Sequence, residues 1–571
     1  MIRAKFINFF LICLFLLLGL GLFNLELLQG DKFRELSRKN SIRLLPQQGA
    51  RGRIIDRKGR IIVDNKLSYN VMILPQNTND HEQTLNRVAR LLGLDAKAMK
   101  EAYRKGYVAS SVPVVVAKNI DLKKAIMLEE LKSELPAVII QSNPVRNYLY
   151  DRLACHVIGY LSEIDRWRLT KMADYGYKTK DIVGFGGVEE QYDYYLRQEE
   201  GGLSVEVDHR GRFKRTLGFQ PPRNGTDLQL TIDLDIQRIV QNSLGGQKGC
   251  AIIMDAHTGE IIAMASAPDF NPSIFIERKT GALSGVLNNP DAPLINRAIS
   301  GLYPAGSVFK LVVAVAALET KKINPSTTFL CQGKITVGRK EFLCWNTHGL
   351  QNLPLAIAHS CNVFFYMTGL LTGGQAIHDY ALKLGFAKST GFELPYEANG
   401  FIPSPLWAKI NKFRKWYDGD TANLSIGQGA VSVTPLQIAR MMAVFASAGN
   451  LLHPYLVKAI GGNDIASSEH RPVHLNLKDT TIEHIRDGLR KVVTDQGGTA
   501  NVLSDLPVSV AGKTGTAQAP PGQAHAWFTG FFPFQNPKFV ICVFLEHGGP
   551  GYYSCVVAKH IIKDMAEGGL I

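Results

Sequence analysis

The chain reads Tyr303-Pro304-Ala305-Gly306-Ser307-Val308-Phe309-Lys310 directly ahead of an almost unbroken apolar run, Leu311 to Glu319. A Pro/Gly turn followed by such a run predicts a buried helix with Ser307 in its first turn. Residues at i and i+3 are neighbours on a helix, so the Lys310 amine lies within reach of the Ser307 hydroxyl. A serine needs a base to become nucleophilic, and a desolvated lysine with a lowered pKa can be that base. The stretch therefore predicts a nucleophile, its base and the helix that carries both.

Two further motifs support a catalytic role for this pair, because Ser-x-x-Lys alone also occurs by chance in long chains. Ser360-Cys361-Asn362 lies 53 residues after Ser307, and Lys513-Thr514-Gly515-Thr516 lies 153 residues beyond Ser360. Ser-x-x-Lys, Ser-Asp-Asn and Lys-Thr-Gly form the signature of penicillin-binding proteins and serine β-lactamases. The chain thus resembles the penicillin-recognising acyltransferases, with Cys361 where the signature has Asp.

The resemblance implies an acyl transfer through a serine ester. Ser307 attacks the carbonyl between two D-alanines of a peptidoglycan stem peptide, and Lys310 takes its proton. Ser360 relays a proton to the leaving amine, while Asn362 holds the substrate amide. The amine of a second stem peptide then attacks the acyl-enzyme, and β-lactams are expected to acylate the same serine.

The third motif is expected to bind the substrate. Lys513 supplies positive potential, and the resemblance assigns substrate binding to Thr514, Gly515 and Thr516. The two threonine hydroxyls hold the terminal carboxylate of the substrate in a charge-assisted contact. The resemblance also implies that the backbone N–H groups of Ser307 and Thr516 form the oxyanion hole.

A first segment of the chain is expected to be a membrane anchor. Phe6 to Leu25 contains twenty residues without a charge, which is long enough to span a bilayer as a helix. A cleaved signal peptide is the alternative, but no small-x-small cleavage site follows the run. The charges flanking the run do not fix its orientation by the positive-inside count. The resemblance places the bulk of the chain in the periplasm, held by a single pass through the inner membrane.

Composition shifts divide the chain into three regions, 1–30, 31–225 and 226–571. The resemblance implies that these are a cytoplasmic tip with the transmembrane anchor, a juxtamembrane stalk with a pedestal, and the transpeptidase domain. Arg51 to Asp64 alternates apolar runs around Lys58-Gly59 and predicts a β-hairpin, whose Arg and Asp residues we expect to be structural. It resembles the opening of the non-catalytic, dimerisation-type pedestal of class B penicillin-binding proteins. Pro221 to Gly225 is a turn-rich break before the catalytic domain.

The fold class follows from the strands and from the resemblance together. Apolar strands are predicted at Ala251–Met254, Ile261–Ala265, Val508–Lys513 and Phe539–Leu545. The resemblance implies an α/β (α+β) penicillin-recognising serine transpeptidase fold, in which helices flank an antiparallel sheet, preceded by a mostly β pedestal.

The charge pattern and the resemblance together indicate the partners and the cellular role of the chain. The formal charge of +14 is spread along the chain without a nucleic-acid motif, so a basic surface near an anionic membrane or wall is favoured. The resemblance is closest to the elongation members of class B, with a septal transpeptidase as the nearest alternative. It implies a membrane glycan polymerase and rod-shape scaffold proteins as partners, and no organic cofactor. A β-lactamase or carboxypeptidase and a penicillin-sensing receptor are the interpretations from other classes.

A cysteine-rich insert lies between the first two motifs. Cys331, Cys344, His348 and Cys361 follow one another at intervals of 13, 4 and 13 residues. Three thiolates and an imidazole suit a structural, tetrahedral Zn²⁺. The resemblance adds weight, because some elongation transpeptidases have a zinc site built from this insert. The alternative is a Cys331–Cys344 disulfide, which an oxidising periplasm favours.

Overall fold

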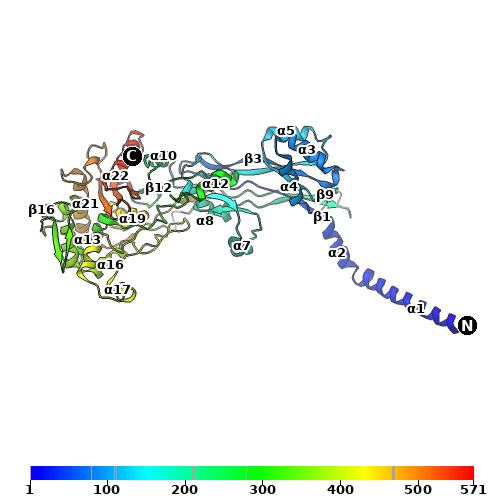
Figure 1. Cartoon of the computed structure of the whole chain (residues 1–571), viewed down its shortest axis with the longest axis horizontal. Helices are drawn as coiled ribbons and strands as arrows, with labels where there is room; N and C mark the ends of the chain where they lie inside the picture. Colours follow the sequence, from blue (N-terminus) through cyan, green and yellow to red (C-terminus); the bar gives the residue numbers. More distant parts are fainter. Residues whose placement is uncertain are drawn as a thin grey trace. The chain divides into compact units, whose positions relative to one another are not determined.

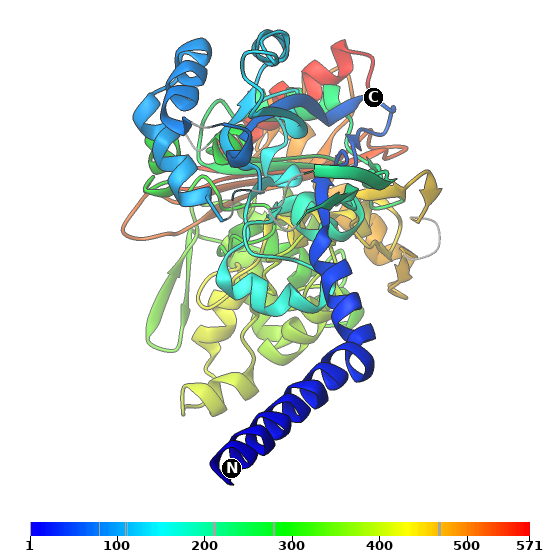
Figure 2. The same cartoon turned by 90° about the vertical axis from the view of Figure 1, so that its right-hand side faces the viewer.

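The computed structural model describes residues 2–78, 80–108, 110, 112–208, 213–277, 280–465 and 470–571. They form two compact units, and each unit is assembled from separate stretches of sequence (Figures 1 and 2). Unit 1 comprises Met1–Gly52, Asn65–Val145 and Arg197–Gly225, and unit 2 comprises Arg53–Asp64, Arg146–Leu196 and Thr226–Ile571. The domain boundaries expected at residues 30 and 225 stay predictions.

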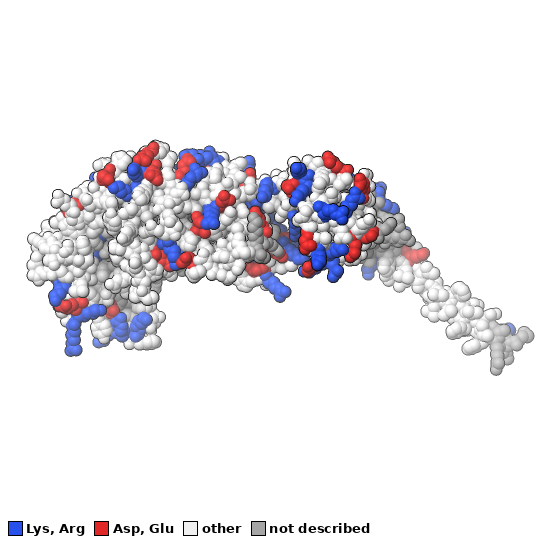
Figure 3. All heavy atoms as spheres, turned by 45° about the horizontal axis from the view of Figure 1, so that its top comes forward, with Lys and Arg blue, Asp and Glu red and all other residues white. Residues whose placement is uncertain are grey.

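The N-terminal segment is helical throughout the expected anchor. Helix α1 (Ile2–Phe23) continues into a π-helical turn (Asn24–Leu28) and is followed by α2 (Gly30–Ser41). Lys5–Leu28 is an apolar span of 24 residues, in which the most apolar 18-residue window has a mean hydropathy of 2.7 and no buried residue. Figure 3 shows this helix almost free of charged side chains, while blue and red groups are interspersed elsewhere on the visible face. An apolar helix exposed all round fits a single-pass membrane anchor.

Unit 1 has two sheets and a core of its own. In the first, β8 (Gly201–Val207) pairs antiparallel with β1 (Ile42–Gln47) and β9 (Phe213–Gln220). In the second, the distal part of β3 (Ile61–Ile73) pairs with β4 (Val114–Ile120), and β5 (Val138–Tyr148) also pairs with β3. Three helices are capped by aspartates that accept backbone N–H groups: α3 (His81–Leu92), α4 (Ala96–Gly106) and α5 (Leu122–Glu130). Their apolar faces and the β3–β4 pair form one buried cluster.

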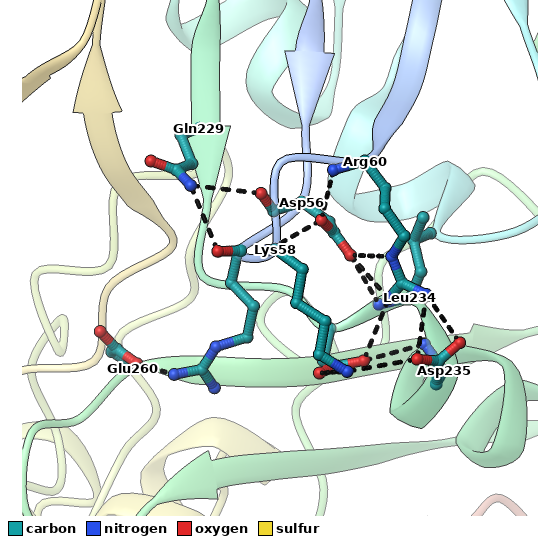
Figure 4. A network of polar contacts seen from close by, with 9 residues as sticks. Asp56, Lys58, Arg60, Gln229, Leu234, Asp235 and Glu260 are labelled. Atoms are coloured by element: carbon teal, nitrogen blue, oxygen red, sulfur yellow. Dashed lines mark hydrogen bonds and ion pairs between the residues drawn. The ribbon is translucent and has the colours of Figure 1, made fainter.

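The predicted hairpin around Lys58-Gly59 belongs to unit 2. Strand β2 (Ile54–Ile55) pairs antiparallel with the start of β3 and parallel with β10 (Leu228–Leu230). The Asp56 carboxylate is fully buried and accepts from the Lys58 and Arg60 backbone N–H groups, both at 2.8 Å (Figure 4). Arg60 also donates to Asp235 at 2.8 and 2.9 Å. These Arg and Asp side chains pair with one another, as expected.

Short elements of unit 2 follow in residues 155–196: α6 (Cys155–Ile158), β6 (Tyr160–Glu163), α7 (Arg166–Met172), β7 (Ile182–Phe185), α8 (Gly187–Gln191) and α9 (Asp193–Leu196). Gly159 has φ +85°, and a Cβ there would lie 2.0 Å from the Gly186 carbonyl oxygen, so only glycine fits this crossing. The Arg146 guanidinium and the Glu189 carboxylate, 1% and 0% exposed, form a 2.7 Å ion pair. This pair joins the end of β5 to α8.

A five-stranded antiparallel sheet forms the centre of unit 2, in the order β12-β11-β23-β22-β21. Its strands are β11 (Gly249–Asp255), β12 (Ile261–Ala267), β21 (Ala511–Ala517), β22 (His525–Phe532) and β23 (Phe539–Leu545). Strand β21, which carries the third motif, is the edge strand. It begins at Ala511, later than the predicted Val508, and Lys513 lies opposite Thr529.

Helices pack around this sheet (Figure 1). Helices α10 (Leu234–Ser243), α19 (Pro435–Ala446) and α22 (Tyr552–Glu567) contact its strands. The predicted buried helix is α13 (Lys310–Glu319), in which nine of the ten residues are buried, and it contacts α15 (Asn362–Thr372) and α21 (Asp479–Thr494). The remaining helices of eight or more residues are α12 (Thr280–Leu287), α16 (Gly374–Lys383) and α18 (Asp418–Ser425), and the shorter ones are α11 (Ser273–Glu277), α14 (Leu353–Ala358) and α17 (Pro405–Asn411).

Short strands complete unit 2. Two hairpin-like pairs form the insert between the first two motifs: β13 (Phe329–Cys331) with β16 (Gly349–Gln351), and β14 (Lys334–Val337) with β15 (Lys340–Leu343). The others are β17 (Asn450–Leu451), β18 (Val457–Ile460), β19 (Asn463–Asp464) and β20 (Val473–His474). The insert therefore lies directly beside α15, which contacts β13 and β15.

Candidate active site

Ser307 lies in a 3-10 turn, Gly306–Phe309, that runs directly into α13. Gly306 has φ +55°, donates its N–H to the Gly427 carbonyl at 3.0 Å, and lies so close to β21 that a Cβ would be 2.9 Å from Thr516 O. Trp527 Nε1 donates to Pro304 O at 3.1 Å. The turn is thus fixed from three sides, and Ser307 is half-buried at its surface.

Lys310 begins α13 and its side chain is fully buried. Its Nζ donates to Ser360 O at 2.7 Å, to Ser360 Oγ at 3.2 Å and to Asn362 Oδ1 at 2.7 Å. Burial lowers the pKa of Lys310 from 10.5 to about 8, against a smaller opposing effect of the Cys344 and Cys361 thiols. The structure therefore joins the first two motifs through one amine that is close to its titration point at neutral pH.

The second motif is a tight turn between α14 and α15. Ser360 has φ +51°, a left-handed conformation that is costly for a residue with a Cβ, and only 6% of it is exposed. Cys361 is the N-cap of α15, where its sulfur accepts the Phe364 N–H at 3.5 Å. Asn362 donates from Nδ2 to Leu343 O at 3.1 Å, which orients its oxygen toward Lys310.

The third motif lies on edge strand β21. Lys513 is fully buried, and burial together with the nearby charge of Lys310 lowers its pKa well below the ordinary value. Its Nζ donates to Thr514 O at 3.0 Å. A Cβ at Gly515 would lie 2.9 Å from Val308 Cγ2, so a glycine here lets the strand approach the nucleophile turn. Alternate N–H groups of an edge strand have no strand partner, and β21 packs against that turn.

The two threonines of this motif have different partners. The Thr514 and Thr499 hydroxyl oxygens lie 2.7 Å apart, and Thr514 is 7% exposed. The exposed Thr516 accepts the Gly551 N–H at 3.0 Å. The motifs that we predicted to be catalytic are therefore adjacent: Lys310 bonds the Ser360 turn, and β21 packs on the Ser307 turn.

The structure also gathers the four predicted metal ligands. The ligand atoms of Cys331, Cys344, His348 and Cys361 all lie within 4.8 Å of one another, and all eight cysteines of the chain are free. His348 Nδ1 is 3.6 Å from Cys331 Sγ and 3.5 Å from Cys344 Sγ. The Asn362 backbone N–H donates to Cys344 Sγ at 3.2 Å. Hydrogen bonding by Cys361, helped by backbone N–H groups, lowers the pKa of Cys344.

Sequence reasoning missed several residues that hold the site. His359 Nε2 lies 3.0 Å from Asp495 Oδ1, and its Nδ1 lies 3.0 Å from Gln351 Oε1. Trp345 Nε1 donates to His359 O at 3.1 Å. Thr499 contacts Thr514 as described. The Gly497-Gly498 pair was the only local signal, and it indicated a turn without naming its partners.

Comparison with known proteins agrees with this geometry. Residues 249–567 match the family described as "Penicillin binding protein transpeptidase domain", and residues 46–230 match "Penicillin-binding Protein dimerisation domain". Peptidoglycan D,D-transpeptidase MrdA of Acinetobacter baumannii is 30% identical over 564 residues, covering 94% of this chain and 83% of that protein.

Two solved structures are similar along most of the chain. The complex between the penicillin-binding protein PBP2 and MreC from Helicobacter pylori has 26% identity and a TM-score of 0.82, and covers 93% of this chain and 99% of its own. A structure titled for the coordination of polymerization and crosslinking by a peptidoglycan synthase complex has 30% identity and a TM-score of 0.74, with 98% of each chain covered. With the three motifs meeting inside the matched catalytic domain, this chain belongs to the penicillin-binding protein transpeptidase family.

Proposed function

We propose that the chain is a D,D-transpeptidase that cross-links peptidoglycan stem peptides through a serine acyl-enzyme during cell elongation, and that β-lactams acylate the same serine. The observation that carries this is the Lys310 amine, buried one helical turn after Ser307 and bonded to both Ser360 and Asn362. Such an arrangement activates a hydroxyl without any further base.

Acylation begins when the neutral Lys310 amine takes the Ser307 proton as the oxygen attacks the penultimate D-alanine carbonyl. The Ser307 and Thr516 N–H groups stabilise the oxyanion, which the packing of β21 on the nucleophile turn supports. The Ser360 hydroxyl, 3.2 Å from Lys310 Nζ, passes a proton to the leaving amine of the terminal D-alanine. Asn362 orients Lys310 and holds the substrate amide.

The terminal carboxylate of the donor peptide binds at β21. Lys513 supplies positive potential, and the Thr514 and Thr516 hydroxyls donate to the carboxylate, beside Gly515, which lets the strand approach the serine. The amine of a second stem peptide then attacks the ester, and the Lys310 and Ser360 groups return the protons in the reverse order. Water as the acceptor would make the chain a carboxypeptidase or β-lactamase, and slow turnover of bound penicillin separates these cases.

Covalent labelling tests the assignment of the nucleophile. Full-length protein in detergent, incubated with a fluorescent penicillin, should carry one label on the peptide that contains Ser307. The Ser307→Ala variant should remain unlabelled. Ser300→Ala, which changes a half-buried serine in the same segment, is the matched control and should be labelled like the unaltered chain. A labelled Ser307→Ala protein would overturn the proposal.

The cysteine cluster fits a structural zinc site. Three thiols and the His348 Nδ1 converge, Cys344 has a lowered pKa, and an N–H of Asn362 donates to its sulfur, as suits a metal-bound thiolate. When bound, Zn²⁺ there would supply a structural cross-link and no reacting group. Cys331, Cys344 and His348 of the insert would then be tied to Cys361, inside the Ser360 turn. A Cys331–Cys344 disulfide explains neither the position of His348 nor that of Cys361.

The proposed location is the inner membrane, with α1 as a single-pass anchor and the catalytic unit in the periplasm. The relatives support partners for this chain: one solved relative is in complex with MreC, and another belongs to a synthase that coordinates polymerization and crosslinking. We therefore include a membrane glycan polymerase and a rod-shape scaffold protein in the proposal. The septal alternative has no such support among these relatives.

A further inference from the structure

One loop contacts both the second and the third motif. It runs from Asp495 to Thr499, between α21 and a 3-10 turn at Asn501–Leu503. The loop is closed by its own hydrogen bonds: Asp495 Oδ1 accepts the Gly497 N–H at 2.8 Å, and Asp495 O accepts the Gly498 N–H at 2.9 Å. Such a turn holds its two ends at a fixed separation.

The Asp495 end contacts the turn that carries Ser360. Asp495 Oδ1 lies 3.0 Å from His359 Nε2, and a Cβ at Gly497 would lie 2.9 Å from the same nitrogen. The Thr499 N–H donates to Ala358 O at 3.2 Å. The two residues directly before Ser360 are therefore held by this loop through one side-chain contact and one backbone bond.

The other end contacts the strand that carries the third motif. Thr499 Oγ1 lies 2.7 Å from Thr514 Oγ1, and either oxygen can be the donor. A hydroxyl has one proton to give. If Thr514 donates its proton to a substrate carboxylate, its oxygen still accepts, and Thr499 is the neighbour that can donate to it. Thr499 then fixes the rotamer in which the Thr514 proton points away from the loop.

The two contacts act on two conformations that are unfavourable unless neighbouring groups hold them: the Ser360 backbone and the Thr514 hydroxyl rotamer. Ser360 has φ +51°, which costs energy unless the surroundings hold it. The Thr514 hydroxyl is nearly buried, so an unsupported rotamer would leave it unsatisfied. A single rigid loop that contacts both sets the distance between the proton relay and the carboxylate site.

We propose that the loop from Asp495 to Thr499 is a positioning element of the active site, with Thr499 orienting the carboxylate-binding hydroxyl of Thr514 and Asp495 holding the Ser360 turn through His359. This inference deepens the proposed transpeptidase function and rests on it. Neither residue touches the reacting atoms. Each acts through a neighbour, so the two should affect different quantities.

The test compares benzylpenicillin with its methyl ester, which lacks the carboxylate. Acylation of the full-length chain in detergent is followed by intact mass spectrometry, and the second-order rate constant is obtained for each compound. Thr499→Val should slow acylation by benzylpenicillin about 5- to 10-fold, the loss of one hydrogen bond, and leave the ester reaction unchanged. Thr499→Ser should restore the rate. Thr494→Val, an exposed threonine whose hydroxyl bonds only Arg490 O among the described residues, is the matched control.

The Asp495 contact, unlike the Thr499 contact, should affect the reactions of both compounds. Asp495→Ala should lower the limiting acylation rate at saturating compound by the same factor for both compounds. Asp495→Asn, which keeps an acceptor oxygen for His359, should recover most of this rate. The inference about the loop would be overturned by equal losses for both compounds in Thr499→Val, or by no loss in either variant. Acylation of the unaltered chain would still support the proposed function in that case. An unaltered chain that neither compound acylates would defeat both.

Discussion

The pH dependence of acylation tests the role of Lys310 directly. Only the neutral amine can take the Ser307 proton, and burial lowers the pKa of Lys310 from 10.5 to about 8. At pH 7 about one tenth of the amine is then neutral, against about 0.03% for an amine at its ordinary pKa. The buried position therefore raises the reactive fraction about 300-fold at this pH.

The expected profile follows from this titration. The second-order rate constant for acylation by a fluorescent penicillin, measured by stopped flow, should rise about 9-fold from pH 6 to pH 7 and only about 1.8-fold from pH 8 to pH 9. Because this constant reports the free enzyme, its inflection belongs to the unliganded Lys310. A change of less than twofold between pH 6 and pH 8, or a further tenfold rise from pH 9 to pH 10, would refute the reasoning.

A single variant shows whether the inflection belongs to Lys310. Asn362 Oδ1 lies 2.7 Å from Lys310 Nζ, so Asn362→Asp places a carboxylate next to the amine. An opposite charge at this distance favours the protonated form, and the inflection should move up by about 1 to 3 pH units. Lys491→Gln, which removes a charge from the exposed face of α21, is the control and should leave the inflection where it is. An Asn362→Asp profile with an unmoved inflection assigns the titration to another group.

Three further predictions concern the metal, the core and the membrane. Protein purified without added zinc should contain about one Zn²⁺ per chain, and His348→Ala should lower both the melting temperature and the acylation rate; a metal-free, fully active protein with Cys331 bonded to Cys344 would contradict this. Arg146→Ala removes the buried partner of Glu189 and should cost about 3 to 5 kcal/mol in denaturant unfolding, whereas a loss below about 1 kcal/mol would show that the pair is dispensable. Extraction from membranes should require detergent, and a mature N-terminus beyond Leu28 would show that the apolar helix is cleaved.

The sequence predicted those parts of the fold whose signal is local. The apolar run after Lys310 is α13, Phe539–Leu545 is β23 with the predicted bounds, and the hairpin turns at Lys58-Gly59. In each case the pattern of apolar residues or the turn chemistry lies within about fifteen residues. The predicted start of β21 was wrong by three residues, because the apolar pattern continues to Val508 whereas the ladder with β22 begins at Ala511.

The sequence predicted the site residues that lie within the three motifs, but not the contacts that join the motifs to one another. Spacing placed Lys310 near Ser307, but its bonds to the Ser360 turn depend on how α13 packs against α15. Asp495 and Thr499 themselves lie in no recognisable motif, although their partners His359 and Thr514 lie beside or within one. Such contacts are set by tertiary packing, which no periodicity encodes.

The discontinuous composition of unit 2 has a consequence for the order in which the protein can fold during synthesis. The stretch Arg53–Asp64 leaves the ribosome long before β10, its parallel partner, and β11 must wait for β23, roughly 300 residues later. Loop closure of this length makes such pairings late and slow. Strand β2, with buried Ile54, therefore lacks its β10 partner until residue 230 has been made, and buried strand β11 lacks β23 until residue 545. Dependence on a holding chaperone should thus be greatest for nascent chains that end before residue 539.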